Sequence, residues 1–208
     1  MNQNLYALLR ERFPEDRSQP VIERADGTRI SYDEMEAEAG RIAALLGQLG
    51  VQKGDRVAVQ VDKSPENLFL YLGTLMAGGV YLPLNTAYQK GEISYFLGDA
   101  KPRVMVCRPE TRESIEAVAA EAGVDHVLTL DAAGGGSLSE QARECEPMTR
   151  IVECDADDLA AICYTSGTTG RSKGAMITHR NLSSNAFALH RIWGFEQGDV
   201  LLHALPIF

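Results

Sequence analysis

Apolar residues recur at two different spacings along the chain, and these spacings predict helices that alternate with strands. From Met35 to Leu49 apolar residues return every three or four positions, as on the buried stripe of a helix. Ser31 and Glu34 precede this stripe with the spacing of a capping box, and a glycine follows it, so both ends of the helix are predicted. In RVAVQV, residues 56–61, valine occupies every second position, which predicts a strand.

The same alternation continues to about residue 150. Ser64 is typical of an N-cap and Pro65 of a first helical residue; the helix they predict runs to Met76 and is apolar nearly all round, as expected of a deeply packed helix. Further helices are expected near residues 92–97, at 112–122 and from Ser137, with Glu140 completing its cap, and further strands at 80–84, 103–107 and 126–130. Strands joined through helices favour parallel pairing, so the predicted fold class is α/β, with a mostly parallel sheet flanked by helices.

We expect two units in this chain. Residues 1–150 form an N-terminal α/β subdomain, and an acidic, irregular segment, Glu146–Asp158, leads into the second unit. Residues 151–208 would begin that second α/β subdomain and leave it incomplete, with strands at 159–164, 175–178 and 199–206 and a helix at 181–193. Because the last residues are an apolar run, we expect Phe208 to be a truncated end.

Composition excludes several classes of protein. With 208 residues and 45% hydrophobic content the chain can bury a core, and its net charge of −9 argues against a nucleic-acid partner. Cys107, Cys145, Cys154 and Cys163 have neither redox-pair nor zinc-ligand spacing, so we expect reduced thiols. No apolar stretch approaches ~18 residues and no cleavable leader is present, which predicts a cytoplasmic protein without a membrane partner.

One loop carries candidate chemistry. The stretch TSGTTGRSKG, Thr165 to Gly174, follows an apolar run and contains three glycines, which permit positive φ and let backbone N–H groups converge on an anion. Hydroxyl groups and two cations add to these donors, which indicates a polyphosphate ligand rather than an ordinary surface hairpin. Neither a Walker A motif nor G-x-G-x-x-G occurs.

At these residues the sequence resembles the adenylate-forming enzymes, which include acyl-CoA synthetases, adenylation domains of peptide synthetases and luciferases. YTSGTTGRSKG is similar to their phosphate-binding signature, and ISYDEM (30–35) and LMAGGVYLPLN (75–85) look like two further family elements. GGVYLPLNTAY, GRSKGAM and HALPIF look most like malonyl-CoA synthetases. Ser172 stands where the family often has proline, which leaves the loop less restrained.

The resemblance implies an AMP-forming acid:CoA ligase. A carboxylate, malonate by similarity, would attack the α-phosphate of ATP with Mg²⁺, and coenzyme A would then displace AMP. The expected nucleotide-binding residues are Thr165, Ser166, Thr168 and Thr169 as hydroxyl donors, Gly167 and Gly170 as backbone approach points, and Arg171 and Lys173 as cations. The family's adenine and Mg²⁺ segment, hinge aspartate and C-terminal lysine have no match here, so no catalytic residue and no metal ligand is assigned and the chain alone is expected to be inactive.

Two alternatives stay open: an adenylation domain that loads a carrier protein, and a non-catalytic nucleotide-binding fragment. The four histidines lack ligand spacing and are expected at the surface or at strand ends, with His203 kept as a candidate near the acyl pocket. Trp193 and Phe187 are expected in the core.

Overall fold

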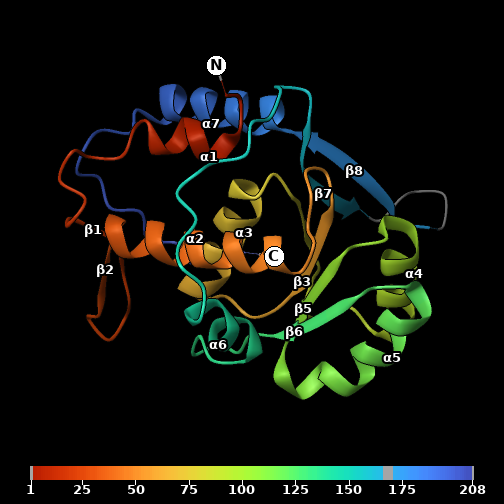
Figure 1. Cartoon of the computed structure of the whole chain (residues 1–208). Coiled ribbons are helices and arrows are strands. Elements are labelled where there is room, and N and C mark those ends of the chain that lie inside the picture. The colour runs from red at the N-terminus through yellow and green to blue at the C-terminus, as the bar shows by residue number, and fades with distance from the viewer. Residues whose placement is uncertain (1, 166–170, 208) are drawn as a thin grey trace.

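The computed structural model describes residues 2–165 and 171–207 (Figure 1). A six-stranded sheet in the order β6-β5-β3-β4-β7-β8 forms its centre. Neighbouring strands from β6 to β7 are parallel, and β8 is antiparallel to β7. The mostly parallel α/β fold predicted from the sequence is therefore confirmed. The strands are β3 (Arg56–Gln60), β4 (Val80–Pro83), β5 (Val104–Cys107), β6 (His126–Thr129), β7 (Leu159–Thr165) and β8 (Lys173–Thr178).

Helices cover both faces of this sheet (Figure 1). One face carries α2 (Tyr32–Gln48), α3 (Pro65–Met76) and α6 (Ser137–Arg143), and the other carries α4 (Lys90–Ala100) and α5 (Arg112–Ala122), which follows a short 3₁₀ turn at Pro109–Thr111. Val57 and Val59 pack in the first core and Ala58 in the second. β3 is buried on both faces. Its alternating valines therefore distinguish one buried face from the other, and do not distinguish a buried face from a solvent-exposed one.

Several predicted helix ends are confirmed by their hydrogen bonds. The N–H of Ser31 donates to Glu34 Oε2 at 2.7 Å, and the N–H of Glu34 donates back to Ser31 Oγ at 3.2 Å. Ser64 Oγ accepts the N–H of Asn67 at 3.1 Å at the start of α3. These caps satisfy N–H groups that have no partner inside a helix, which is why they can be recognised from local sequence.

The cap of α6 differs from the prediction. Gly136, at φ 118°, is its N-cap, and no side chain caps the helix. The hydroxyl of Ser137 instead accepts the N–H of Thr129 at 2.9 Å and so ties α6 to the end of β6. A tertiary hydrogen bond has replaced the local one that the Ser137–Glu140 spacing predicted.

The N-terminal elements were not predicted, apart from the strand just before α2, which ISYDEM indicated by its resemblance to a strand-to-helix element of the family. They are α1 (Leu5–Arg10) and an antiparallel hairpin of β1 (Pro20–Glu23) and β2 (Arg29–Ser31). α1 lies beside α3 and α7 (His179–Trp193), and Asn4 Nδ2 donates to the Leu75 carbonyl at 2.7 Å. Such short elements carry too few residues to show a period.

The C-terminal segment shows two further corrections. Residues 199–206 form no strand: Val200 and Leu202 are 94% and 89% exposed, and no described strand pairs with them. Trp193 is 63% exposed and Phe187 43% exposed, so neither side chain is in the core. A strand needs a hydrogen-bonding neighbour, and an apolar helix face needs a covering layer, which the described residues do not provide here.

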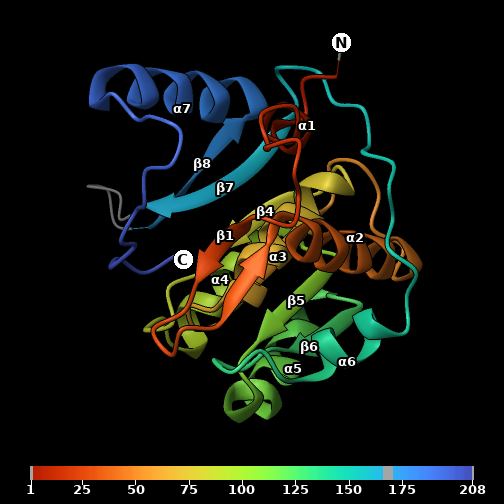
Figure 2. The ribbon, with the colours of Figure 1, turned by 90° about the vertical axis from the view of Figure 1, so that its left-hand side faces the viewer.

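The predicted boundary at residue 150 stays a prediction. β7 joins β4 through a single parallel pair, Tyr81 with Ala161, whereas β3 and β4 share four. Figure 2 shows β7 and β8 set apart from the other strands, with α7 beside them. In the described residues, no helix is long and apolar enough to cross a membrane, and the four cysteines are free, as expected.

His179 joins the N-terminal segment to the start of α7. It is the first residue of α7, directly after β8 ends at Thr178; a histidine at the end of a strand was expected, but this side chain is fully buried. Its Nδ1 accepts the N–H of Leu5 at 3.0 Å, so the neutral ring carries its proton on Nε2, which has no partner among the described residues. Burial lowers the pKa of His179 below its ordinary 6.5; the charge of Asp158 opposes this shift and that of Lys53 adds to it.

We therefore expect the free energy of unfolding to decrease as the pH falls below about 6.5. Below that value the unfolded chain binds a proton that the folded chain excludes, and the loss continues down to the lowered pKa of the folded state. Urea unfolding at pH 7.5 and pH 5.5 measures it. His179→Asn, which keeps an acceptor but no titrating ring, should reduce the difference, whereas His190→Asn on the exposed face of α7 should not. An unchanged difference in His179→Asn would contradict this assignment.

Candidate functional site

The predicted phosphate-binding loop connects two antiparallel strands. Thr165 ends β7 and Lys173 begins β8, and their Cα atoms are paired across the ladder. The strands thus hold the two ends of the loop side by side. Ser166, Gly167, Thr168, Thr169 and Gly170 lie outside the described residues, so their expected roles stay predictions.

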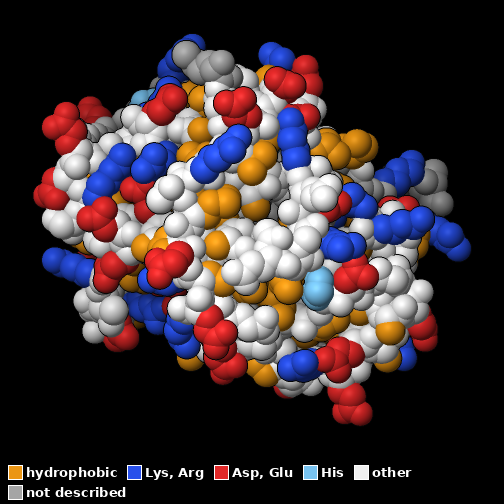
Figure 3. Space-filling view, viewed as in Figure 1, with side chains coloured by type: hydrophobic (Ala, Val, Ile, Leu, Met, Phe, Trp, Pro, Cys, Tyr) orange, Lys and Arg blue, Asp and Glu red, His pale blue; other side chains and the backbone are white. Residues whose placement is uncertain are grey.

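The described members of the predicted site are Thr165, Arg171 and Lys173, and all three are exposed. Lys173 and Arg171 form no ion pair with any described residue. The surface view shows Lys and Arg side chains gathered at the edge where α4 and the start of β8 lie, while charges of both signs alternate elsewhere on that face (Figure 3). A cation without an acidic partner is available to an anionic ligand.

Gly174 has a different role from the one expected. It does not adopt positive φ. A Cβ atom on Gly174 would lie 3.0 Å from Ile162 Cγ2 and 3.4 Å from Tyr164 Cε1, so the glycine makes room for side chains of β7. The lack of space for a side chain, and not a need for positive φ, explains why a glycine stands at this position.

α4 contacts both ends of the loop. The hydroxyl of Tyr95 donates to the Ser172 carbonyl at 2.9 Å, and the hydroxyl of Tyr164 donates to Asp99 Oδ2 at 2.5 Å. Burial and then the Asp99 carboxylate raise the pKa of Tyr164, so this hydroxyl keeps its proton and remains a donor at neutral pH. The guanidinium of Arg171 lies 5.8 Å from the centre of the Tyr95 ring.

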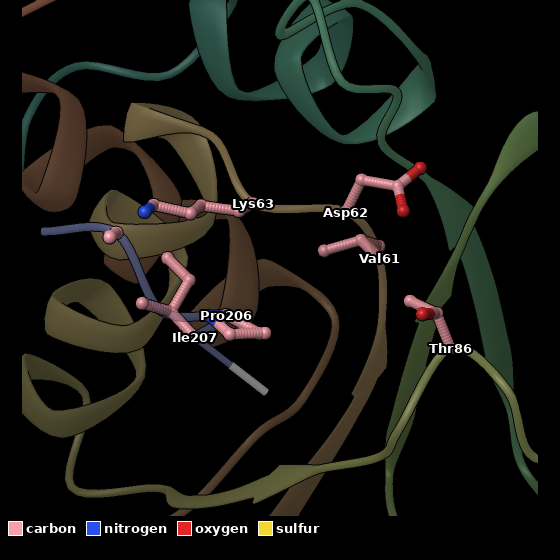
Figure 4. Close-up of a pocket in the computed structure, with 7 residues that line it drawn as sticks. Val61, Asp62, Lys63, Thr86, Pro206 and Ile207 are labelled. Atoms are coloured by element: carbon pink, nitrogen blue, oxygen red, sulfur yellow. The ribbon is translucent and has the colours of Figure 1, made fainter.

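A second feature lies beyond the carboxyl ends of β3 and β4, the edge at which open α/β sheets bind ligands. Figure 4 shows an open pocket there, about 300 Å³ in volume, between the segments that follow both strands and the C-terminal segment. Lys63 Nζ donates to the carbonyl oxygens of His203 and, at 3.0 Å, of Leu205. His203 thus contributes its main-chain carbonyl to this contact and not its imidazole ring.

Sequence reasoning missed Tyr95, Asp99 and Lys63. Tyr95 and Asp99 are four residues apart on α4 and therefore share one helix face, a spacing visible in the sequence. What the sequence does not show is that this face meets a loop more than 65 residues further along the chain. Among the described residues, no three His, Cys, Asp or Glu side chains gather as metal ligands.

Comparison with known proteins identifies relatives over nearly the whole chain. The ATP-bound structure of MatB from Rhodopseudomonas palustris superposes with a TM-score of 0.94 at 52% identity, covering 99% of this chain and 41% of that one. The long-chain-fatty-acid–CoA ligase FadD13 of Mycobacterium tuberculosis is 35% identical over 206 residues, which are 99% of this chain and 41% of the ligase. Gramicidin S synthase 2 of Brevibacillus brevis is 36% identical over 180 residues, 4% of its length.

The chain spans about two fifths of the MatB and FadD13 proteins that it matches. The family description "AMP-binding enzyme" matches residues 9–208, which is far more than half of the chain and includes the loop. The resemblance inferred from YTSGTTGRSKG is thereby confirmed. The chain belongs to the family of AMP-binding enzymes.

Proposed function

We propose that this chain is the ATP-binding part of an AMP-forming acid:CoA ligase. The observation that carries the proposal is the loop between β7 and β8, whose ends present Thr165 and Lys173 side by side. Both side chains are exposed, and Lys173 has no acidic partner among the residues that the structure describes. Family membership and the ATP-bound state of the MatB relative support ATP as the nucleotide.

In the proposed reaction a carboxylate oxygen attacks the α-phosphorus of ATP. The bond from that phosphorus to the bridging oxygen breaks, and pyrophosphate leaves with the negative charge that develops. Hydroxyl groups of Thr165, Ser166, Thr168 and Thr169 and the N–H groups at Gly167 and Gly170 would donate to the β- and γ-phosphate oxygens, and Lys173 and Arg171 would balance their charge. Donors fixed in place before the reaction stabilise the leaving group without reorganisation.

The second half-reaction transfers the acyl group. The thiol of coenzyme A would attack the acyl carbon of the adenylate and release AMP, which leaves a thioester. Mg²⁺, when bound, neutralises phosphate charge; the residues described here supply no cluster of ligands for it. Residues 151–208 would belong to a second subdomain, and a cytoplasmic location would fit the substrates.

Malonate is the proposed acid. The stretches GGVYLPLNTAY, GRSKGAM and HALPIF resemble malonyl-CoA synthetases. The first and third contribute Thr86 and Ala204 to the pocket at Lys63, and the second belongs to the loop. The 52% identity to MatB, against 35% to the fatty-acid ligase FadD13, favours a relative of MatB over a long-chain ligase.

Pyrophosphate exchange by the full-length protein tests the substrate. We expect ATP–pyrophosphate exchange with malonate, weaker exchange with methylmalonate, and little with acetate or long-chain acids. A pocket built to bind the second, non-reacting carboxylate of malonate discriminates against monocarboxylic acids, which leave its polar groups unpaired. Exchange with long-chain acids alone would contradict malonate as the substrate, but it would still support the proposed ligase activity.

A second candidate is an adenylation domain that loads a carrier protein, which the 36% identity to Gramicidin S synthase 2 favours. The two functions differ in the acceptor thiol. Release of AMP that depends on free coenzyme A supports the ligase, whereas release that depends on a phosphopantetheine-bearing carrier protein supports the alternative. ATP binding without pyrophosphate exchange or release of AMP would instead indicate a non-catalytic nucleotide-binding fragment.

A further inference from the structure

Helix α4 holds the loop at both of its ends. On the entry side, Tyr164 is the last residue but one of β7, and its hydroxyl donates to Asp99 at 2.5 Å. On the exit side, the Ser172 carbonyl accepts the Tyr95 hydroxyl at 2.9 Å just before β8 begins. Tyr95 and Asp99 are one helical turn apart, so a single helix face contacts both flanks.

This helix face is itself anchored in the core. Phe96, next to Tyr95, is 1% exposed and packs in the core between α4, α5 and the sheet. Its ring centre lies 4.3 Å from that of Tyr164 and 5.0 Å from that of Tyr88. Any displacement of α4 relative to the loop would therefore disrupt buried aromatic contacts, which makes α4 a rigid support.

The exit side of the loop depends on such a support. Ser172 has a free φ angle and could adopt many backbone conformations, because it lacks the ring by which proline restricts this angle. The Tyr95 hydroxyl holds its carbonyl, and the face of the Tyr95 ring lies 5.8 Å from the guanidinium of Arg171. One tyrosine thus restrains the backbone of one loop residue and the cationic side chain of the residue before it.

Restraint of the ends matters energetically for a loop that binds phosphates. Ordering a residue costs backbone conformational entropy, and a ligand binds more weakly by the cost of any ordering that it must itself produce. Tyr164 on one side and Ser172 on the other are held by hydrogen bonds to α4, so the ligand does not have to order these two flanks.

We propose that Tyr95 and Asp99 are positioning residues that pre-organise the phosphate-binding loop for the polyphosphate tail of ATP. This inference rests on the proposed function and assigns α4 a part in it. Neither side chain needs to touch the nucleotide; both act through Ser172, Arg171 and Tyr164.

The test uses single substitutions in the full-length protein. Tyr95→Phe removes one hydroxyl and keeps the ring, and we expect the Kd and KM for ATP to rise about fivefold, the effect of one hydrogen bond. Asp99→Ala should give a similar rise, and Asp99→Asn, which retains an acceptor for Tyr164, should restore values close to the wild type. The KM for the carboxylate should stay unchanged in all three variants.

Tyr88→Phe is the matched control. Tyr88 belongs to the same aromatic cluster, and its hydroxyl has no hydrogen-bond partner among the described residues, so ATP affinity should be unchanged. Calorimetric titration with ATP measures Kd without requiring turnover. Thermal unfolding measured in parallel separates positioning from folding: a rise in both KM values with a lowered Tm would make the role of Tyr95 structural and overturn the inference.

The two proposals fail differently. Wild-type ATP affinity in Tyr95→Phe and Asp99→Ala, together with lost affinity in Lys173→Ala, would overturn the role of α4 and leave the ligase proposal standing. A wild-type protein that binds no ATP and exchanges no pyrophosphate would overturn the ligase proposal, and the role of α4 with it.

Discussion

Lys173→Ala in the full-length protein is expected to lower ATP–pyrophosphate exchange about a hundredfold. Lys173 is the exposed first residue of β8, directly beyond the loop, and it has no acidic partner among the described residues. Removal of one preorganised contact to charge that develops in a transition state costs about 3 kcal/mol, which corresponds to that factor. Because the side chain is exposed, the free energy of unfolding should change by less than about 0.5 kcal/mol.

Two variants accompany this measurement. Lys173→Arg keeps the positive charge and should recover part of the exchange rate. Arg150→Ala removes one positive charge from an exposed position in the segment that lies along α2, where the Met148 N–H bonds the Gly40 carbonyl, and should leave exchange unchanged. If Lys173→Ala lost stability and activity in the same proportion, the lysine would be a structural residue and the assignment of the loop would fail.

Gly73→Ala is expected to destabilise the fold by about 1–3 kcal/mol, because α2 and α3 pack too closely at this position for any side chain. A Cβ atom on Gly73 would lie 2.7 Å from the carbonyl oxygen of Ala39 and 3.0 Å from Ile42 Cβ and Cγ2. The carbonyl oxygen of Ala39 is held within helix α2, so it can move away only at a cost in free energy. Urea unfolding at neutral pH measures the loss.

Gly47→Ala is the matched control for Gly73→Ala. Gly47 lies in the last turn of α2, and a Cβ atom there would meet nothing within 4 Å. Alanine favours helix over glycine by up to about 1 kcal/mol, so this variant should be as stable as the wild type or more stable. If both variants had the same free energy of unfolding, α2 and α3 would be able to move apart at Gly73 without loss of stability, and the expected steric clash would be refuted.

The Gly73 and Lys173 variants together separate the stability of the fold from the binding of ATP at the loop. The contact between α2 and α3 supports one face of the sheet, and α4 supports the other face and the loop ends. A Gly73 variant should therefore lower stability while ATP affinity of the folded protein stays close to the wild type. The Lys173 variant should show the reverse pattern, so the pair separates folding from ligand binding.

Local signals determined much of this fold in advance. The capping box of Ser31 and Glu34, the N-cap Ser64, and the bounds of α5 at Arg112 and Ala122 are all confirmed. Each depends on hydrogen bonds or periodicity within a few residues, which a sequence displays directly. The family resemblance of TSGTTGRSKG was also recognisable, because its glycines, hydroxyl groups and cations are consecutive in the chain; its phosphate-binding role stays a prediction.

Contacts between distant segments were not determined in this way. The antiparallel turn of β8, the burial of His179 against Leu5, and the exposure of Trp193 all depend on which surfaces meet after folding. Tyr95 and Asp99 look like ordinary residues of an amphipathic helix until the structure places them against Ser172 and Tyr164. The sequence by itself determined most helices and strands of the central sheet and the family resemblance of the loop, because these signals are local. Only the tertiary structure decided which residues hold the ends of that loop, because hydrogen bonds across 65 to 77 residues leave no local pattern.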